Sequence, residues 1–266
     1  MALTEDTLEQ PRARLRKSER REQILMELRL HSHIRISDIA ERFGVSSETV
    51  RRDLDKLSKD GLINRAHGVA SAASRHYPDF NERSLARLGE REAIGRHAAS
   101  LVEPGETILI DSGSTTVELA RFLAYNNTPC TAITNSLTVA MTLGASEAAE
   151  VILCPGDYLP SEAAVVGTDT LEFIDRMRVD RCLIGASALT EEGVSETVRG
   201  FAAVKRAMLR SAGTSHLLVD SEKFGRVGMT RVARLDEINS VVVDRTPDTG
   251  LEEAMSAAGV EILVAA

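Results

Sequence analysis

The run DSGSTT, residues 111–116, has the residue types and the position expected of an anion-binding loop. It follows the apolar run TILI and opens the helical stretch TVELARFL, so the amides of Ser114, Thr115 and Thr116 would point out at the positive end of a helix. A phosphate group can bind there, and Gly113 would let the backbone fold closely. The run lacks the lysine of a Walker A loop and the GxGxxG spacing, which disfavours a nucleotide. The alternative is a serine- and threonine-rich helix start that binds no ligand.

Four further loops with small, hydroxylated or amide side chains also follow apolar runs. They are TNS (134–136), PGD (155–157), GAS (185–187) and DSEK (220–223). Lys223 could neutralise a bound phosphate, although a solvated surface lysine is the commoner case for a single lysine. The TNS run could hydrogen-bond a polyol, or it could cap a helix expected from Leu137 to Leu143. Together with DSGSTT, these loops predict a polar pocket.

Six short apolar runs must position these loops. Strands without hydrophobic alternation, interleaved with helices, predict a parallel sheet covered on both faces. Ligands bind beyond the carboxyl ends of such strands, so the five loops are expected to share one rim. The runs are TILI (107–110), CTAI (130–133), VILC (151–154), CLIG (182–185), HLLV (216–219) and SVVV (240–243).

The N-terminal part of the chain predicts a winged helix-turn-helix. Apolar spacing indicates a first helix over residues 18–30. Ser37 is a suitable N-cap for a short second helix ending at Gly44, and Ser46 is a suitable N-cap for a third helix. The run LINRAHGVA (62–70) then indicates a pair of strands that forms the wing.

Two adjacent arginines stand near the start of the third helix. The apolar stripe that begins at Val50 leaves Arg51 and Arg52 on the solvent side. Arginine suits guanine edges and phosphate oxygens in the major groove of DNA. The alternative is that both side chains only solvate the helix and pair with Asp55 and Asp53, but their place in a helix-turn-helix favours DNA. The predicted DNA contacts are Ser46, Ser47, Thr49, Arg51, Arg52, Lys56, Arg65 and His67.

Length and charge agree with two domains of different character. A chain of 266 residues exceeds the usual size of one domain. Its formal net charge is -8, but residues 11–70 hold 14 Lys and Arg against 9 Asp and Glu, and residues 71–266 hold 18 against 28. Only the basic front is expected to meet a polyanion. The start lacks the apolar run of a signal peptide and no run of ~18 apolar residues occurs, so we expect a cytoplasmic protein.

The cysteines indicate neither a metal site nor a disulfide framework. Cys130, Cys154 and Cys182 are widely spaced and form no CxxC pair, which favours reduced thiols. We predict no metal and no cofactor. A redox-sensing role for Cys154 is disfavoured because no cationic neighbour in the sequence would lower the pKa of its thiol.

The expected domain boundaries follow from composition. The run SAASRHYPD (71–79) is small and polar, as linkers are. A charged helix is expected from about Asn81 to Val102; it could pack on the body or pair with another subunit. Its expected inner face is Leu85, Leu88, Ile94, Ala98 and Leu101. The expected parts are a tail (1–17), a winged helix-turn-helix domain (18–70), the linker (71–79) and an effector-binding and oligomerisation domain (80–266).

Both halves resemble one known family. The run ISDIAERFGVSSETVRRDLDKLSKDGLINRAHG resembles the N-terminal signature of the DeoR family of bacterial transcriptional regulators. The runs IDSGSTT, TNSL, VKRAM and LVDSEKFG resemble its C-terminal effector domain. The chain departs from the family pattern at Val69, where a second glycine is usual, and at Pro155, where Gly-Gly is common.

The resemblance implies a fold and a function. The C-terminal α/β domain would be similar to ribose-5-phosphate isomerase and related sugar-phosphate enzymes, with a phosphorylated sugar as ligand. The protein would repress a carbohydrate-catabolism operon, bind double-stranded operator DNA as a homodimer or homotetramer, and be released by that sugar. The alternative is a sugar-phosphate isomerase or a lactonase-like enzyme, although fold likeness alone does not carry activity. The implied pocket residues are Asp111, Gly113, Ser114, Thr115, Thr116, Asn135, Ser136, Lys205, Asp220 and Lys223.

Overall fold

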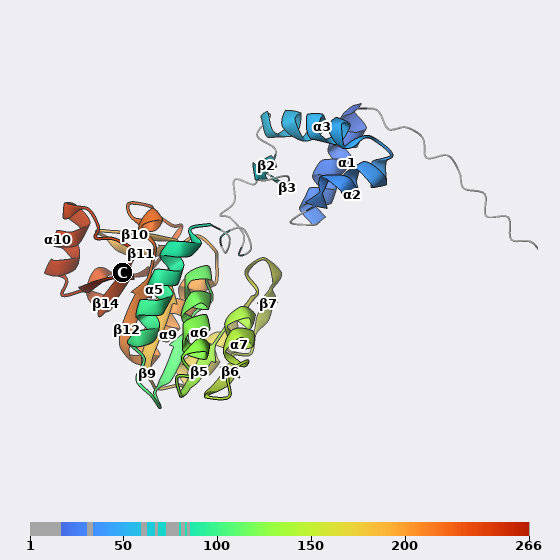
Figure 1. Ribbon diagram of the computed structural model, residues 1–266. Helices are drawn as coiled ribbons and strands as arrows, with labels where there is room; N and C mark the ends of the chain where they lie inside the picture. Colours follow the sequence, from blue (N-terminus) through green and yellow to red (C-terminus); the bar gives the residue numbers. More distant parts are fainter. Residues whose placement is uncertain are drawn as a thin grey trace, which may run out of the picture. The chain divides into compact units, whose positions relative to one another are not determined.

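The computed structural model describes residues 17–30, 34–59, 63–66, 69–72, 80, 83 and 86–265. The chain divides after Tyr77 into two compact units, residues 1–77 and 78–266, and each is described by itself (Figure 1). Within the described ranges, no helix has both the length and the apolar character needed to cross a bilayer.

The described part of the first unit is a small helical domain with a short sheet. Apolar side chains from three helices form its core: Ile24, Ile39, Ala40, Val50, Leu54 and Leu57. Gly44, in the turn between the second and third helices, has a φ of 60°, in the left-handed region that favours glycine. The elements are α1 (Lys17–Leu30), β1 (Ile34–Arg35), α2 (Ile36–Phe43), α3 (Ser47–Lys59), β2 (Ile63–Ala66) and β3 (Val69–Ala72).

The predicted wing is present, with corrected boundaries. Strands β2 and β3 pair antiparallel, and β1 pairs with the other side of β3. Helix α2 begins at Ile36, so Ser37 lies in its first turn and does not cap it. Strand β3 extends to Ala72, past the boundary expected at residue 70. The rest of the predicted linker, 73–79, and residues 1–16 of the predicted tail lie outside the described residues.

The second unit is built on a seven-stranded parallel sheet with the order β15-β14-β12-β9-β4-β5-β6 (Figure 1). All six strands expected from apolar runs belong to it, and the seventh, β15, was not predicted. The strands are β4 (Thr107–Ile110), β5 (Cys130–Thr134), β6 (Ala149–Leu153), β9 (Val179–Gly185), β12 (Ala212–Leu218), β14 (Ser240–Val243) and β15 (Glu261–Val264).

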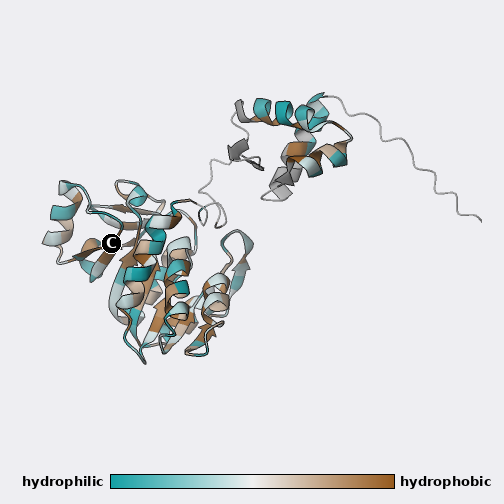
Figure 2. Ribbon diagram, in the orientation of Figure 1, coloured by the Kyte–Doolittle hydropathy of each residue, from teal (hydrophilic) through white to brown (hydrophobic). Residues whose placement is uncertain are grey.

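Helices cover both faces of this sheet, as predicted. In β4, Ile108 and Ile110 belong to the apolar cluster under α5, α6 and α7, whereas Leu109 belongs to the cluster under α8, α9 and α10. Figure 2 shows hydrophobic strands in the interior and hydrophilic positions on the outer faces of the helices. The helices are α5 (Leu88–Ser100), α6 (Ser114–Tyr125), α7 (Leu137–Leu143), α8 (Thr168–Asp175), α9 (Phe201–Ser211) and α10 (Thr249–Ala257).

Helix α5 is shorter than predicted. It begins at Leu88, about seven residues later than expected, and Leu88 is 42% exposed rather than on the inner face. Ile94 and Ala98 are buried as predicted. Gly95 permits the close contact of α5 with α6, because a Cβ at this position would lie 2.7 Å from the backbone carbon of Glu118 and from the backbone nitrogen of Leu119.

In the described part of the second unit, two small antiparallel sheets and three short 3-10 helices join the main elements, and these were not predicted. Their strands have three or four residues, too few to give a periodic pattern. One sheet is the hairpin β7 (Asp157–Leu159) and β8 (Ala164–Val166); the other has the order β10 (Ala188–Thr190), β11 (Gly193–Glu196), β13 (Thr230–Ala233). The 3-10 helices are η1 (Pro160–Glu162), η2 (Ser221–Lys223) and η3 (Leu235–Glu237).

Candidate DNA-binding and ligand-binding sites

Helix α3 presents its polar face to solvent. Ser46 caps the helix, since its Oγ accepts a hydrogen bond from the Thr49 amide at 3.2 Å. The side chains of Arg51 and Arg52 are 56% and 76% exposed, and Lys56 and Ser47 are also exposed. Six of the eight predicted DNA contacts therefore lie on or beside the outer face of one helix. The backbone of Arg65 is in β2, and His67 lies outside the described residues.

The alternative pairing expected for the arginines is wrong in one part. Arg51 and Arg52 lie 3.8 Å and 3.4 Å from carboxylate oxygens of Glu48. Asp53 is fully buried and bonds to Arg20 at 2.7 Å and to Arg21 at 2.9 Å instead. This ion pair fastens α1 to α3 and helps to fix the orientation of the exposed arginines.

The sheet order places the five predicted loops next to one another. The strands that precede them, β12, β9, β4, β5 and β6, are consecutive neighbours, so their carboxyl ends form one edge. The chain runs from β4 outward to β6 and then returns to the other side of β4 at β9, which makes the gap between β4 and β9 the switch point where open α/β sheets bind ligands. Asp111 follows β4, and its Oδ2 accepts the amide of Gly185, the last residue of β9, at 3.2 Å.

Lys205 of α9 holds Asp111 at this switch point. Its Nζ donates to Oδ2 of Asp111 and lies 3.3 Å from Oε1 of Glu196 in β11. Ser187, in the loop after β9, donates to Oε2 of Glu196 at 2.5 Å. The Lys205 side chain is only 2% exposed, so these charges are screened little by solvent. Lys205 therefore supports the rim through Asp111.

One ammonium group is shared between two buried carboxylates. Burial opposes the charge on Lys205, but Asp111 and Glu196 more than offset burial, and the pKa of Lys205 is raised. Burial also raises the pKa of Asp111, and here it outweighs the attraction of Lys205.

Three buried polar atoms on the rim have no hydrogen-bond partner among the residues that the structure describes. They are Oδ1 of Asp111, Oγ of Ser112 and Oδ1 of Asn135. Buried polar atoms are nearly always paired, and an unpaired one costs roughly 1–3 kcal/mol. Carboxylate and amide oxygens accept hydrogen bonds, so a ligand that carries hydroxyl groups would satisfy them.

The N-terminus of α6 opens on the same rim. Thr116 Oγ1 donates to the carbonyl oxygen of Asp111 at 2.7 Å, so it braces the loop, and Ser114 and Thr115 remain for a ligand. Gly113 is extended, with a φ of 167°, and a Cβ there would come no nearer than 3.5 Å to Thr116 Oγ1. A residue other than glycine could therefore also be accommodated at this position.

The side chains of the TNS loop form hydrogen bonds mainly with the backbone of the protein. Ser136 Oγ accepts the Val139 amide at 3.2 Å and so caps α7, which was the alternative left open by the sequence. Thr134 Oγ1 accepts the Ser136 amide at 3.0 Å. Asn135 exchanges two hydrogen bonds with the backbone of Val165, at 2.8 and 3.1 Å. Oδ1 of Asn135 has no partner among the described residues and is free to meet a ligand.

The PGD loop is closed against α8. Gly156 has a φ of 146°, and a Cβ there would lie 2.1 Å from Thr170 Oγ1. Thr170 also donates to the carbonyl oxygen of Pro155 at 2.6 Å. Glycine is required at position 156 for these reasons, and the loop forms a wall of the rim.

The DSEK loop brings buried charges to the other end of the rim. Lys223 is 7% exposed, so it is not a solvated surface lysine. Burial lowers the pKa of Lys223, although Asp220 and Glu222 oppose this effect. The carboxylate of Asp220 lies 3.5 Å from Nε of both Arg87 and Arg91. Neither arginine, nor Glu196, was predicted, because no motif marks them.

The cysteines are buried and unreactive by environment. Burial raises the pKa of the Cys154 thiol and of the Cys182 thiol to about 12, and it also raises the pKa of Cys130. Thiols in this state are protonated at neutral pH, which argues against redox sensing by Cys154.

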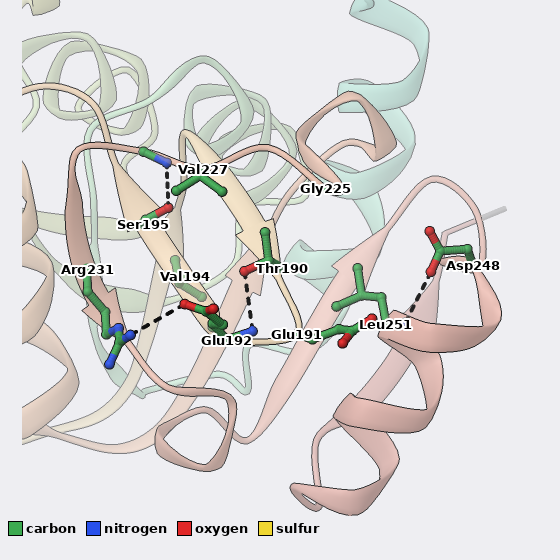
Figure 3. A pocket seen from close by; sticks show the side chains of 12 residues that line it. Thr190, Glu191, Glu192, Val194, Ser195, Gly225, Val227, Arg231, Asp248 and Leu251 are labelled. Carbon is green, nitrogen blue, oxygen red and sulfur yellow. Dashed lines mark hydrogen bonds and ion pairs between the residues drawn. The ribbon is translucent and has the colours of Figure 1, made fainter.

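A cavity of about 510 Å³ lies elsewhere, between the β10-β11-β13 sheet and the start of α10 (Figure 3). Glu191, Glu192 and Asp248 line it, together with Arg231, whose guanidinium lies 3.6 Å from Glu192. An acidic lining repels a phosphorylated ligand. The cavity contains no residue predicted for the ligand pocket, so we place the candidate site at the rim.

A helix-turn-helix unit with exposed arginines, followed by an α/β unit with a polar rim at its switch point, defines a ligand-responsive transcriptional regulator. A family model described as the DeoR-like helix-turn-helix domain matches residues 20–76. A second, described as the DeoR C terminal sensor domain, matches residues 87–245. The chain belongs to the DeoR family.

Relatives that are named as repressors match over most of both chains. The HTH-type transcriptional repressor GlcR of Bacillus subtilis is 32% identical and covers 91% of this chain and 93% of its own. The glycerol-3-phosphate regulon repressor of Escherichia coli is 29% identical and covers 91% and 96%. The lactose phosphotransferase system repressor of Lactococcus lactis is 32% identical and covers 86% and 92%.

Among solved structures, ribose 5-phosphate isomerase A from Methanocaldococcus jannaschii aligns with a TM-score of 0.39 and 17% sequence identity. The alignment covers 52% of this chain and 55% of that one. A similarity at this level carries no information on activity.

Proposed function

We propose that the protein represses a carbohydrate-catabolism operon by binding operator DNA through α3 and the wing, and that a phosphorylated sugar at the rim of the second unit releases it. The names of its relatives, which include repressors of glycerol-3-phosphate and lactose phosphotransferase genes, support this class of target. The exposed arginines of α3 support the contact with DNA.

One observation carries the ligand assignment. Buried acceptor oxygens of Asp111 and Asn135 lack a partner among the described residues, beside the start of α6. The helix end would hold a phosphate, and the two oxygens would accept hydrogen bonds from sugar hydroxyls. Ser114, Thr115 and Lys223 would contact the phosphate, and the remaining predicted pocket residues would brace the loops.

A thermal-shift screen of the full-length protein tests the ligand class. The probes are ribose 5-phosphate, fructose 6-phosphate, glucose 6-phosphate and glycerol 3-phosphate, each with its neutral counterpart as a control. A ligand at 100 times its Kd stabilises the folded state by ~2.7 kcal/mol, which is readily seen. Stabilisation or operator release by a neutral sugar alone would contradict the phosphate assignment.

Two substitutions test the predicted phosphate contacts. We expect Lys223→Ala and Thr115→Ala to weaken effector binding while leaving operator binding intact, because both residues lie in the sensor unit. Titrations of effector and of operator DNA would measure both affinities. If both variants still respond to the effector with the parent's affinity, the phosphate site lies elsewhere.

The DNA contact is tested on a duplex selected from a random library. Arg51→Ala and Arg52→Ala should each weaken binding by ~1–3 kcal/mol if the side chain reads a base edge. Arg210→Ala in the second unit, a solvent-exposed arginine paired with Asp175, is the matched control. Fluorescence anisotropy gives the affinities, and parental affinity with an unchanged footprint in both variants would contradict the assignment.

The active species is proposed to be a homodimer or homotetramer. One winged helix makes few contacts, whereas specific sites are usually bound at ~10⁻⁸–10⁻¹¹ M. Sedimentation velocity with labelled operator DNA would give the stoichiometry. A single chain bound per operator at saturation would contradict this part of the proposal.

We also propose that the sensor does not turn its ligand over. The family model that matches residues 87–245 is described as a sensor domain, which supports this proposal, and Asp111 is the residue that would act as general base in an isomerase-like site. We expect no conversion of the four sugar phosphates by the purified protein. Conversion that disappears in Asp111→Asn would favour the enzyme alternative.

A further inference from the structure

The segment by which the chain enters the second unit is fastened to the ligand rim by three arginines. Arg83, Arg87 and Arg91, which we call the arginine clamp, lie between residue 78, where the unit begins, and the body of α5. The sequence from the DNA-binding unit to the sensor therefore passes through them.

One arm of the clamp reaches η1, whose neighbouring residues are hydrogen-bonded to the loop after β5. Arg83 donates to Oε1 of Glu162 at 3.2 Å and to Oε2 at 2.5 Å, and both side chains are buried. Glu162 precedes Ala163, whose carbonyl oxygen accepts the amide of Leu137 at 2.9 Å, at the start of α7. Val165 follows in β8 and pairs with Asn135. A shift of Asn135 on binding a ligand would thus be passed to Glu162 within a few bonds.

The other arm reaches the loop after β12. Nη2 of Arg87 donates to Oδ2 of Asp244 at 3.0 Å and to Oγ of Ser221 at 3.2 Å. Nε of Arg87 and Nε of Arg91 each lie 3.5 Å from the Asp220 carboxylate. Asp220 opens the DSEK loop that carries Lys223, so this arm ends at the predicted phosphate contact.

Arg91 joins the two arms. One of its terminal nitrogens donates to the carbonyl oxygen of Arg83 and, at 2.6 Å, to that of Ala86. Arg91 is 2% exposed, and it therefore locks the backbone of the entry segment to the Asp220 loop inside the protein. A buried guanidinium is costly unless it is fully paired, and these two hydrogen bonds offset part of that cost.

The arm that meets Asp220 lacks some of the hydrogen bonds that its arginines could make. Nε of Arg87 and Nε of Arg91 have no hydrogen-bond partner within the described part of the chain, although the ion-pair contact to Asp220 is present. Arg87 also has a φ of 50°, a left-handed conformation that costs energy for a residue other than glycine. Local backbone strain of this kind is common in switch regions.

We propose that the arginine clamp is the relay by which a ligand at the rim changes the affinity for DNA, with Arg83, Arg87 and Arg91 as positioning residues. The inference rests on the proposed function and adds the residues that transmit the signal. A phosphate beside Lys223 competes with Asp220 for nearby cations and opens the Asp220 arm, while hydroxyl contacts at Asn135 act on the Glu162 arm. The entry segment then takes a second arrangement.

Two variants of the full-length protein test the relay. Arg87→Asn removes the guanidinium with a residue that tolerates left-handed φ, and Glu162→Gln removes one charge with little change in shape. Arg210→Gln, which breaks the exposed pair with Asp175, is the matched control. For each protein we measure the Kd for a selected operator duplex with and without the most stabilising of the four sugar phosphates, the Kd for that sugar phosphate, and Tm.

The expected result distinguishes binding of the sugar phosphate from the release of operator DNA that it causes. The parent and the control lose operator affinity about tenfold or more at saturating ligand, a coupling of ~1.4 kcal/mol. Both clamp variants lose less than about twofold while binding the ligand within about threefold of the parent. A variant that is merely destabilised would lower Tm without abolishing this ratio.

Two outcomes overturn the relay. If the variants bind the sugar phosphate and release DNA as the parent does, the clamp transmits nothing and the proposed function stands. If the parent itself binds none of the four sugar phosphates, the proposed ligand is wrong, and the clamp is judged on operator affinity alone. A change of fivefold or more in both variants then supports the relay, and an unchanged affinity overturns it.

Discussion

Replacing Lys205 by methionine should destabilise the second unit by ~3–5 kcal/mol at neutral pH, the usual cost of removing one partner from a buried ion pair. The Lys205 side chain is 2% exposed and touches Asp111, which is fully buried, and Glu196, which is 7% exposed. Methionine fills much of the same volume, so the loss is electrostatic rather than steric. For a unit of this size the Tm should fall by roughly 6–20 °C.

The pKa of Asp111 predicts the direction in which the destabilisation by Lys205→Met changes with pH. Burial already raises the pKa of Asp111, and loss of the lysine raises it further. A carboxyl whose pKa is higher in the folded state contributes stability that is complete below its unfolded pKa and is lost as the pH rises through its folded pKa. The deficit of Lys205→Met relative to the parent should therefore be largest at pH 8 and narrow towards pH 5.

Urea unfolding followed by circular dichroism at pH 8 and pH 5 measures this deficit. Arg210→Met is the matched control, because it lies on the same helix and its pair with Asp175 is exposed, so we expect a change of less than ~1 kcal/mol. Adding Glu196→Gln to Lys205→Met should restore part of the stability at pH 8. A deficit no larger than that of the control, or one that widens towards pH 5, would refute the buried-charge argument.

Two further predictions concern other parts of the chain. Burial, assisted by the Arg181 guanidinium, lowers the pKa of His216 to about 4, so its contribution to stability should be lost as the pH falls from about 6.5 towards 4. After allowance for solvent screening this loss is ~1–2 kcal/mol, and His216→Asn should show a correspondingly flatter stability profile in thermal melts over that range. Ser46→Ala removes the cap on the Thr49 amide and should destabilise the first unit by ~1 kcal/mol, whereas Ser37→Ala should have little effect. Equal losses in the two serine variants would contradict the assignment of the cap.

The sequence predicted those features whose cause is local or periodic. Buried parallel strands consist of continuous apolar residues, so the apolar runs predicted β4 and five other strands of the seven-stranded sheet. Once the strands were known, the rule that parallel strands end at one edge brought Asp111, Asn135 and Lys223 to one rim without further knowledge of the fold. The buried stripe of α3 left Arg51 and Arg52 outside for an equally simple reason.

Two kinds of feature were not predicted. Some are contacts between residues that lie far apart in the sequence, and others depend on a residue type that can serve either a structural role or ligand binding. Glu196 and Lys205 meet Asp111 only after β11 and α9 fold onto the switch point, and no spacing in the sequence records this. Ser136 has the same hydroxyl whether it caps a helix or binds a polyol, so only the hydrogen bond to Val139 could decide. Asp53 could have been found, because it lies three residues after Val50 on the buried stripe and a carboxylate there needs a partner.

The distribution of charge on the rim argues that sugar hydroxyls, more than the phosphate, determine which ligand is bound. Lys205 is already paired with two carboxylates, and Lys223 lies beside Asp220 and Glu222, so carboxylates offset much of the positive charge that the rim offers a phosphate beyond the end of α6. Inorganic phosphate should consequently bind weakly. The acceptor oxygens of Asp111 and Asn135 are different, because a ligand that lacks a hydroxyl at either position leaves a buried acceptor unpaired at a cost of roughly 1–3 kcal/mol, or about 5- to 150-fold in affinity. Deoxy analogues of the true effector should therefore lose more affinity than analogues in which the phosphate is replaced by a sulfate. The two buried acceptors are accordingly the positions at which relatives of this repressor would be re-engineered for another sugar.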